Sequence, residues 1–351
     1  MFDLEAFDAH EEVVFVARPE VGLKAIVAIH DTTLGPAMGG IRMWRYPDSA
    51  AATTDALRLA RTMTMKNALA GLPHGGGKAV VLGDPKRDKS PALLDALGDV
   101  IERLGGRYVG AEDVGIGLDD VRRLRQRTGY VTGLGTAGDD EDPSPWTARG
   151  VFVGLRAAAR HRLGRDDLEG LRVGVQGLGA VGFKLCAHLH RAGCRLVVAD
   201  LDPARTDAAH EAFGAEVSGS DAILTASVDV LAPCALGAVL DAATIAGMEA
   251  RVVAGAANNP LRREADAEVL AARGVLYVPD YVLNAGGVIA AAMEHEGRVD
   301  ERHLRRRVDA IEGTVVDILA RAEREGTTPL AAADREALAV LARGRPWRHA
   351  A

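Results

Sequence analysis

The sequence predicts a two-domain α/β protein whose second domain contains a doubly wound parallel sheet. Its 351 residues exceed what one hydrophobic core usually organises. Residues 133–145 combine glycines, prolines and a four-residue acidic run, a composition typical of a linker. After this segment short apolar runs alternate with helix-length segments, and this alternation is typical of parallel strands joined by crossover helices. We therefore expect one domain over 1–135 and another over 145–320.

Composition and charge limit the class of protein. Hydrophobic residues make up 48% and charged residues 26%, an ordinary globular balance. Forty-two basic and forty-nine acidic residues give a net charge of −7, the wrong sign for a nucleic-acid partner. The apolar runs are shorter than the ~18 residues that a membrane span needs, and the acidic start resembles no signal peptide. Few, irregularly spaced cysteines fit a reducing compartment, so we expect a cytoplasmic protein without membrane or nucleic-acid partners.

The first domain is expected to mix strands with amphipathic helices. Apolar patterning predicts strands over 13–17 and 23–30, and a helix over 49–65. Residues 71–78 (GLPHGGGK) interrupt the pattern, and 79–82 is expected to resume as a buried strand. A helix over 91–104, a short strand over 107–110 and a helix over 118–126 follow.

The second domain is expected to alternate strands and helices. The predicted strands are 172–176, 196–200, 228–231, 251–255 and 275–278. Helical segments over 304–325 and 328–341 end the chain, and the helices from about 321 to 351 are expected to pack on the first domain.

A glycine-rich turn follows the first of these strands. The turn consists of Gly177, Leu178, Gly179, Ala180, Val181 and Gly182. Its first glycine permits a tight turn, its second lets a pyrophosphate approach the backbone, and its third lets the next helix pack closely. The following strand ends in Asp200, 23 residues after Gly177 and near the ~20-residue offset of a ribose-binding acid. The turn predicts a dinucleotide site, and Asp200 favours NAD over NADP, a preference that Arg205 could soften.

Two lysines and one carboxylate of the first domain are the candidate catalytic groups. A solvated surface charge is the ordinary alternative for a lysine, but Lys66 lies among apolar residues and Lys78 follows three glycines. A glycine run permits close approach of a ligand and leaves a neighbouring lysine partly desolvated. Asp113, in VGAEDVG, could alternatively cap a helix. Beside a dinucleotide domain, these groups indicate an anionic substrate that undergoes hydride transfer with proton exchange.

Two other kinds of site are not expected. The segment before Lys78 is not a P-loop, because Leu72 replaces the required glycine and Ala79 the required serine or threonine. No metal site is expected, since residues two apart on one helix point to different faces. The residues concerned are Cys186, His188, His190 and Cys194, which follow the glycine-rich turn.

Motifs along nearly the whole chain resemble the amino-acid dehydrogenase family, especially its leucine, valine and phenylalanine dehydrogenases. They are GPAMGGIR (35–42), DALRLARTMTMKNALAGLPHGGGKAVV (55–81), AEDVG (111–115), DPSPWTARGV (142–151), VQGLGAVG (175–182), APCALG (232–237), AGAANN (254–259) and PDYVLNAGG (279–287). The resemblance implies a dimerisation-type N-terminal domain, a C-terminal Rossmann domain and an active site in the cleft between them. It also implies a homo-oligomer, either a dimer or an octamer.

The implied reaction is the reversible oxidative deamination of an L-amino acid by NAD and water to a 2-oxo acid, ammonia and NADH. By this resemblance Lys66 binds the substrate α-carboxylate, Lys78 activates water, and Asp113 exchanges protons with the amino nitrogen. Gly39 and Gly40 line the substrate site. Of the remaining implied residues, Asn259 holds substrate and nicotinamide in register, and Thr147 and Asn284 contact the nicotinamide end.

The same resemblance indicates an apolar substrate side chain. Met38 stands where the glutamate enzymes have a lysine that pairs with the side-chain carboxylate, so glutamate is excluded. The other implied pocket residues, Ala111, Val288 and Ala291, are apolar too. Leucine, valine or isoleucine is therefore expected first, phenylalanine or tryptophan second, and a catalytically silent NAD-binding paralogue third.

Two residues depart from the family pattern. Ile41 replaces the usual threonine after the glycine pair, and Trp146 occupies a usually small position, where packing near the linker is expected.

Overall fold

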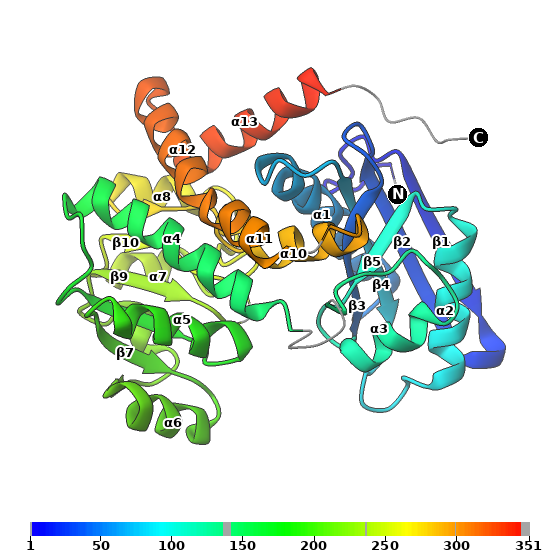
Figure 1. Ribbon diagram of the computed structural model, residues 1–351, viewed down its shortest axis with the longest axis horizontal. Coiled ribbons are helices and arrows are strands. Elements are labelled where there is room, and N and C mark those ends of the chain that lie inside the picture. The colour runs from blue at the N-terminus through cyan, green and yellow to red at the C-terminus, as the bar shows by residue number, and fades with distance from the viewer. Residues whose placement is uncertain (1, 136–141, 236, 299, 345–351) are drawn as a thin grey trace. The chain divides into compact units, whose positions relative to one another are not determined.

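The computed structural model describes residues 2–135, 142–235, 237–298 and 300–344 (Figure 1). Contacts divide the chain into a first unit (Met1–Asp142, Val288–Asp300 and Ala337–Ala351) and a second unit (Pro143–Gly287 and Glu301–Glu336). Part of the predicted linker, 136–141, lies outside the described residues. Residues 288–300, placed by the sequence within 145–320, belong to the first unit.

The first unit is built on a five-stranded sheet in the order β1-β2-β4-β3-β5 (Figure 1). Its strands are β1 (Glu12–Arg18), β2 (Leu23–Asp31), β3 (Ala37–Trp44), β4 (Gly75–Leu82) and β5 (Tyr108–Ala111). Its complete helices are α1 (Ser49–Leu69), α2 (Pro91–Arg103) and α3 (Leu118–Arg125). It also contains most of α10 (Gly286–His295) and the C-terminal half of α13 (Pro329–Arg343). Strand β3 runs parallel to both β4 and β5, whereas β2 is antiparallel to β1 and β4.

Helices cover both faces of this sheet. Alternate residues of a strand point to opposite faces, and the two buried clusters follow this rule. Ala79 and Val81 pack with α2 and α3, whereas Val80 packs with Ala52 and Ala56 of α1. Lys78 has the phase of Val80 and therefore lies on the face that α1 covers.

The three glycines before Lys78 belong to β4, although the sequence predicted that the strand begins only at Ala79. A side chain at Gly75 would meet Asp31 O at 1.8 Å, one at Gly76 would meet Thr64 N at 2.1 Å, and one at Gly77 would meet the Tyr108 ring at 2.8 Å. The absence of side chains at these glycines therefore lets the end of β2, helix α1 and the Tyr108 ring approach closely. Their extended backbone pairs with neighbouring strands, so β4 begins four residues before the predicted start at Ala79.

The second unit contains a parallel six-stranded sheet in the order β11-β10-β9-β6-β7-β8. Its strands are β6 (Arg172–Gln176), β7 (Arg195–Ala199), β8 (Glu216–Val217), β9 (Val230–Pro233), β10 (Val252–Val253) and β11 (Leu276–Tyr277). Its helices are α4 (Ser144–Leu163), α5 (Ala180–Arg191), α6 (Pro203–Phe213), α7 (Ala242–Gly247), α8 (Asp266–Ala272), α9 (Asp280–Leu283), α11 (Glu301–Asp309) and α12 (Ile311–Glu325). The sheet and its helices form the doubly wound domain that the alternating pattern predicts.

Two further elements differ from their predictions. The segment 304–325 was expected to form one helix, but it is divided between α11 and α12 at Ala310. Strand β3 was not predicted, because its two central glycines interrupt the apolar run that marks a buried strand. No described helix has both the length and the apolar character that crossing a membrane requires.

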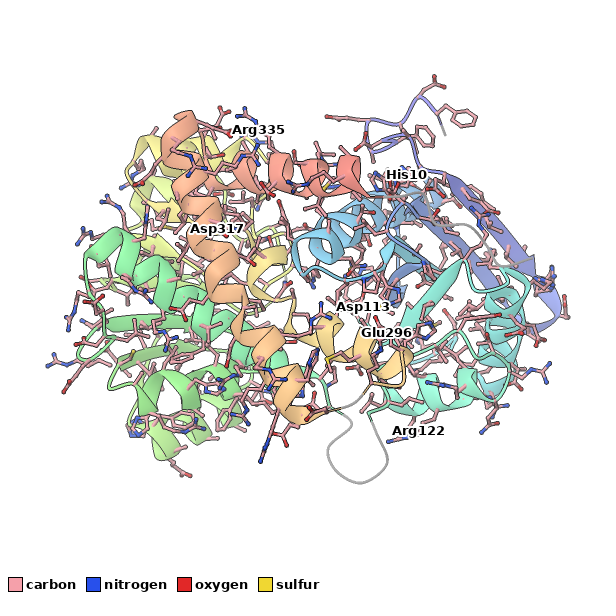
Figure 2. All side chains as sticks on the ribbon, turned by 45° about the horizontal axis from the view of Figure 1, so that its top comes forward. His10, Asp113, Arg122, Glu296, Asp317 and Arg335 are labelled. Carbon is pink, nitrogen blue, oxygen red and sulfur yellow. The ribbon has the colours of Figure 1, made fainter. Side chains whose placement is uncertain are left out.

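Two histidines join the N-terminal segment to α1 and β2. His10, labelled in Figure 2, bonds through Nε2 to the backbone oxygen of Leu57 at 2.9 Å. The rings of His10 and His30 are 4.8 Å apart, and His30 Nδ1 lies 2.8 Å from Thr64 Oγ1. Burial, together with the neighbouring His10, lowers the pKa of His30 to about 4.

This burial predicts acid-sensitive stability. An unfolded histidine binds a proton near its ordinary pKa of 6.5, while folded His30 does so only near 4, so the unfolded state takes up more protons between these values. His74, whose pKa burial and His295 lower to about 4, acts in the same direction. The contribution of His30 to the free energy of unfolding should be constant above pH 6.5 and fall by about 3 kcal/mol toward pH 4. Urea unfolding across this range should show a smaller fall for His30→Gln than for the wild type, whereas exposed His303→Gln should match the wild type.

The packing of Gly76 against α1 generates a second prediction. Gly76→Ala places a methyl group against the Thr64 backbone, which cannot move without displacing α1. The free energy of unfolding should fall by about 1–3 kcal/mol, measured by urea denaturation. Gly129→Ala is the matched control, because its added carbon meets no heavy atom within 4 Å. Equal stability of the two variants would contradict this account of the glycines.

Candidate active site

Four predicted site residues share the α1-covered face of the first sheet. Met38 and Gly40 are two residues apart on β3 and therefore point to the same face. Gly40 pairs with Ala111 of β5, and Met38 pairs with Gly76 of β4. Paired residues of parallel strands point to the same face. The three neighbouring strands therefore bring Met38, Gly40, Lys78 and Ala111 together on one surface.

Lys78 and Asp113 form the central ion pair of this face. Lys78 Nζ lies 2.5 Å from Asp113 Oδ2, and the two side chains are 7% and 14% exposed. A side chain at Gly40 would meet Asp113 Cβ at 2.8 Å and Lys78 Nζ at 2.9 Å, so Gly40 leaves the room that this pair occupies. Burial raises the pKa of Asp113, but Lys78 and Arg42 outweigh burial and hold that pKa well below its usual range. Asp113 is therefore ionised, and it does not cap α3, whose N-cap is Gly117.

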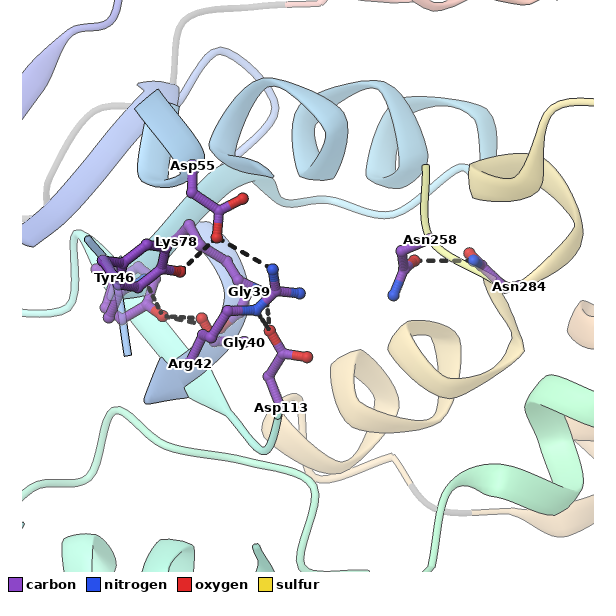
Figure 3. A network of polar contacts seen from close by, with 11 residues as sticks. Gly39, Gly40, Arg42, Tyr46, Asp55, Lys78, Asp113, Asn258 and Asn284 are labelled. Atoms are coloured by element: carbon purple, nitrogen blue, oxygen red, sulfur yellow. Dashed lines mark hydrogen bonds and ion pairs between the residues drawn. The ribbon is translucent and has the colours of Figure 1, made fainter. Parts of the chain in front are cut away.

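A second cation reaches the same carboxylate, and the sequence interpretation missed it. Arg42 Nε donates to Asp113 Oδ2 at 3.1 Å, and Arg42 Nη1 donates to Asp55 Oδ2 at 3.1 Å (Figure 3). The hydroxyl of Tyr46 donates to the same oxygen of Asp55. Arg42 is two residues beyond Gly40, so the alternation of β3 contained the signal that could have identified it.

The hydroxyl of Tyr108 joins β3 to β4 beneath this face. Strand pairing between β3 and β4 skips Gly39 and Gly40, and at this gap Tyr108 accepts a hydrogen bond from Ala79 N at 3.1 Å. The hydroxyl also donates toward the backbone oxygens of Gly39 at 2.9 Å and Gly40 at 3.0 Å. Burial raises the pKa of Tyr108, so this proton stays in place. Tyr108 thus supports the backbone next to Lys78.

Lys66 lies in the last turn of α1 and is 8% exposed. Its neighbour Asn67 donates to Gly75 O at 2.6 Å and to Met38 O at 3.3 Å, which joins this turn to β4 and β3. Asn67 therefore positions the turn that contains Lys66.

Val288 and Ala291 belong to the first unit through α10. The backbone oxygen of Ala291 accepts a bond from Thr132 Oγ1 at 2.8 Å, and Glu294 accepts bonds from the backbone N–H groups of residues 133–135. Because Thr132 N donates to Gly110 O at 2.8 Å, this loop attaches α10 next to β5. Ala291 is buried and Val288 half-buried.

The glycine turn of the second unit has the geometry of a phosphate cradle. Gly177 has a φ of +94°, which favours glycine, and a side chain at Gly182 would meet Gly177 O at 1.9 Å. At Gly179, before α5, the nearest atom to an added carbon is Arg205 Nη1 at 3.9 Å. The first and third glycines are thus required by the protein's own packing, while the second leaves open space at a helix N-terminus, where a pyrophosphate fits.

Asp200 lies beside this turn as an ionised carboxylate. Its Oδ2 accepts a bond from Leu178 N at 2.6 Å, and its Oδ1 accepts one from Asp202 N at 2.9 Å. Despite some desolvation, these bonds and nearby Arg205 lower the pKa of Asp200. Arg205 lies 3.7 Å from both Asp200 and Asp202, so two carboxylates offset its charge.

Three predicted site residues lie elsewhere in the second unit. Asn259 has a φ of +51°, and its N–H donates to Asp280 Oδ2 at 3.1 Å, so its backbone has the left-handed conformation found in turns. Asn284 Nδ2 donates to Asn258 Oδ1 at 2.9 Å (Figure 3). Thr147 lies half-buried near the start of α4.

The two departures from the family pattern have different surroundings. Ile41 is fully buried in the cluster on the opposite face from Gly40, so it does not face Lys78. Trp146 is half-buried, and its backbone oxygen closely approaches Gly286. Among the described residues, no group of histidine, cysteine, aspartate or glutamate has an arrangement that could hold a metal ion.

The buried Tyr108 hydroxyl generates a prediction about stability. Tyr108→Phe retains the ring but removes the partner of Ala79 N and of the two glycine carbonyls, leaving buried polar groups unpaired. The free energy of unfolding should fall by about 1–3 kcal/mol in chemical denaturation. Tyr130→Phe, at a half-buried tyrosine, is the control. If the control loses as much stability as Tyr108→Phe, the hydroxyl does not have the supporting function described above.

Comparison with known proteins agrees with this architecture. Residues 10–130 match the model of the Glu/Leu/Phe/Val dehydrogenase dimerisation domain, and residues 204–342 match the model for glutamate, leucine, phenylalanine and valine dehydrogenases. Leucine dehydrogenase of Bacillus cereus is 47% identical over 95% of this chain and 90% of its own. Valine dehydrogenase of Streptomyces coelicolor is 45% identical over 96% of this chain and 93% of its own.

A solved structure also aligns with nearly the whole chain. L-tryptophan dehydrogenase from Nostoc punctiforme is 42% identical with a TM-score of 0.81, covering 95% of this chain and 96% of that one. These similarities bear out the resemblance seen in the motifs. The chain belongs to the Glu/Leu/Phe/Val dehydrogenase family and is an oxidoreductase that acts on amino acids.

Proposed function

We propose that this protein catalyses the NAD-dependent, reversible oxidative deamination of apolar L-amino acids, with leucine, valine and isoleucine preferred. The observation that carries this proposal is the buried Lys78–Asp113 ion pair on the same face as Met38 and Gly40. The 47% identity to leucine dehydrogenases supports the choice of substrate.

Substrate binding is assigned to charged and small residues of the first unit and to Asn259 of the second unit. Lys66 binds the α-carboxylate, because a largely buried ammonium group offers a strong partner to an anion. Gly39 and Gly40 contact the substrate through their backbone, where a side chain would collide with Met63 or with Asp113. Asn259 holds the substrate carboxylate and the nicotinamide in register.

Asp113 and Lys78 move the protons. Asp113, ionised in the free protein, accepts a proton from the substrate amino group as the C–N bond becomes an imine. Lys78, having first released its own proton to solvent, then accepts a proton from water as the water oxygen bonds to the imine carbon. The resulting carbinolamine collapses when Asp113 returns its proton to nitrogen, which leaves as ammonia. The hydroxyl proton then passes to the Asp113 carboxylate, and the oxygen becomes the carbonyl of the 2-oxo acid.

The substrate side chain is assigned to an apolar pocket in the first unit. Met38, Ala111, Val288 and Ala291 supply no charge to a glutamate side chain, and an unpaired buried carboxylate costs several kcal/mol, or about 10³-fold in selectivity. Discrimination among apolar side chains is weaker, since one methylene contributes about 1–3 kcal/mol. A preference for branched aliphatic substrates with slower use of others is therefore expected.

NAD is assigned to the second unit. When bound, NAD supplies the oxidant that removes the α-hydrogen with its electron pair. The turn Gly177–Gly182 holds its pyrophosphate, and Thr147 and Asn284 contact its nicotinamide end. Asp200 accepts hydrogen bonds from the ribose hydroxyls and repels a 2′-phosphate, and the two carboxylates beside Arg205 weaken that residue as an alternative phosphate ligand.

The protein is further proposed to be a cytoplasmic homo-oligomer. The match of residues 10–130 to a dimerisation domain supports the assembly, and the three free cysteines suit a reducing compartment.

The proposed function is tested by NADH formation at alkaline pH. Leucine, valine, isoleucine, phenylalanine, tryptophan and glutamate are compared as substrates, each with NAD and with NADP. We expect kcat/KM to be highest for a branched aliphatic amino acid with NAD and at least about 10³-fold lower for glutamate. Lys78→Ala should lower kcat by about 10²–10⁴-fold, since it removes the group that accepts the water proton.

The control is Lys24→Ala, which removes an exposed lysine of β2 and should leave kcat unchanged. Lack of turnover with every amino acid, in a protein that binds NAD by fluorescence titration, would favour the silent paralogue. Full activity of Lys78→Ala would refute the assigned role of this lysine.

A further inference from the structure

Asp113 has two cationic partners of different chemistry. Lys78 Nζ and Arg42 Nε contact the same carboxylate oxygen, at 2.5 Å and 3.1 Å. A lysine can release its proton at a pH that proteins experience, but an arginine does not. Of the two charges that compensate Asp113, only that of Arg42 is permanent.

Arg42 is itself held from the opposite side. Its Nη1 bonds to Asp55 Oδ2 of α1, and the Tyr46 hydroxyl donates to that same oxygen (Figure 3). The Arg42 and Asp55 side chains are 18% and 29% exposed, so water screens the contact only partly. A guanidinium donates in fixed directions within one plane, and two bonds to different carboxylates therefore determine where Arg42 lies.

The other titratable groups near Asp113 cannot replace this cation. Tyr108, on β5, is kept protonated by burial, which raises its pKa. Burial, with Asp142 and Asp113 nearby, also raises the pKa of Glu112, which adds no positive charge. Arg42 and Lys78 are the cations that lower the pKa of Asp113.

We propose that Arg42 is a positioning residue that supplies the permanent counter-charge of Asp113, so that Lys78 can give up its proton without leaving a buried carboxylate uncompensated. This inference rests on the proposed function, in which Lys78 and Asp113 exchange protons with water and substrate. Without Arg42, each proton that Lys78 releases leaves the Asp113 carboxylate alone in a poorly solvated site, and such a state is strongly disfavoured. Asp55 and Tyr46 act through Arg42 by fixing its position.

The test separates the charge of Arg42 from its shape. Arg42→Gln removes the charge, and Arg42→Lys retains a charge while losing the planar fork. For leucine deamination, we expect the ascending limb of the pH profile of kcat/KM to move about 1 pH unit higher in Arg42→Gln, because Lys78 must then release its proton beside an unshared carboxylate. We expect kcat at the wild-type optimum to fall about 10²-fold. In Arg42→Lys the limb should stay close to that of the wild type.

Arg45→Gln is the matched control, since Arg45 lies three residues further along and its side chain is 71% exposed. Its pH profile should coincide with that of the wild type. The proposal is overturned if Arg42→Gln has the profile of Arg45→Gln, or if Arg42→Lys moves the limb as far as Arg42→Gln does.

A second variant keeps the test decisive if Arg42→Gln does not fold, as its thermal unfolding would reveal. Asp55→Asn leaves the charge of Arg42 in place but removes the anion that holds it. Its kcat should fall about tenfold with an unmoved limb, and an unchanged kcat overturns the proposal. Lys78→Ala, measured alongside, distinguishes a failure of the proposed function from a failure of the inference about Arg42. Full activity in Lys78→Ala refutes the proposed function. If Lys78→Ala is inactive while the Arg42→Gln variant has the kcat and pH profile of the wild type, only the inference about Arg42 is refuted.

Discussion

A lysine and a carboxylate held 2.5 Å apart in a nearly dry site set the main constraint on the first unit. A buried charge left without any partner costs several kcal/mol, so the carboxylate of Asp113 requires at least one cation beside it. Three adjacent parallel strands satisfy the constraint. β4 supplies Lys78, β3 supplies Gly40 and Arg42, and Asp113 lies two residues beyond the end of β5.

Glycines create the space that these charges and their supports occupy. In β4, the backbone of α1 at Thr64 packs closely against Gly76, and the ring of Tyr108 packs against Gly77. In the second unit, Gly182 lets its helix approach the oxygen of Gly177. Most of these glycines therefore face other parts of the protein and bring supporting elements close, whereas Gly40 and Gly179 leave room beside functional groups.

The chemistry and the choice of substrate follow from the same electrostatic reasoning. A carboxylate with two cationic partners remains ionised, and in the proposed reaction it becomes a better proton acceptor for a neighbouring amine once Lys78 has released its own proton. An apolar residue such as Met38, on the same face, provides no compensating charge for an anionic side chain. The proposed preference for apolar amino acids and the proposed role of Arg42 thus depend on where counter-charges are present on this face.

The sequence by itself determined the two α/β domains and the glycine turn with Asp200, and it nominated Lys66, Lys78 and Asp113 as site residues, because strand and helix periodicity and short motifs are local properties of the chain. It did not predict β3 or the early start of β4, since glycines lack the side chains from which alternation is read. Tertiary structure alone decided that α10 belongs to the first unit and that Arg42, Asp55 and Tyr46 support the ion pair. These contacts join residues such as Arg42 and Asp113, 71 positions apart, and no local pattern specifies which distant groups will share one carboxylate oxygen.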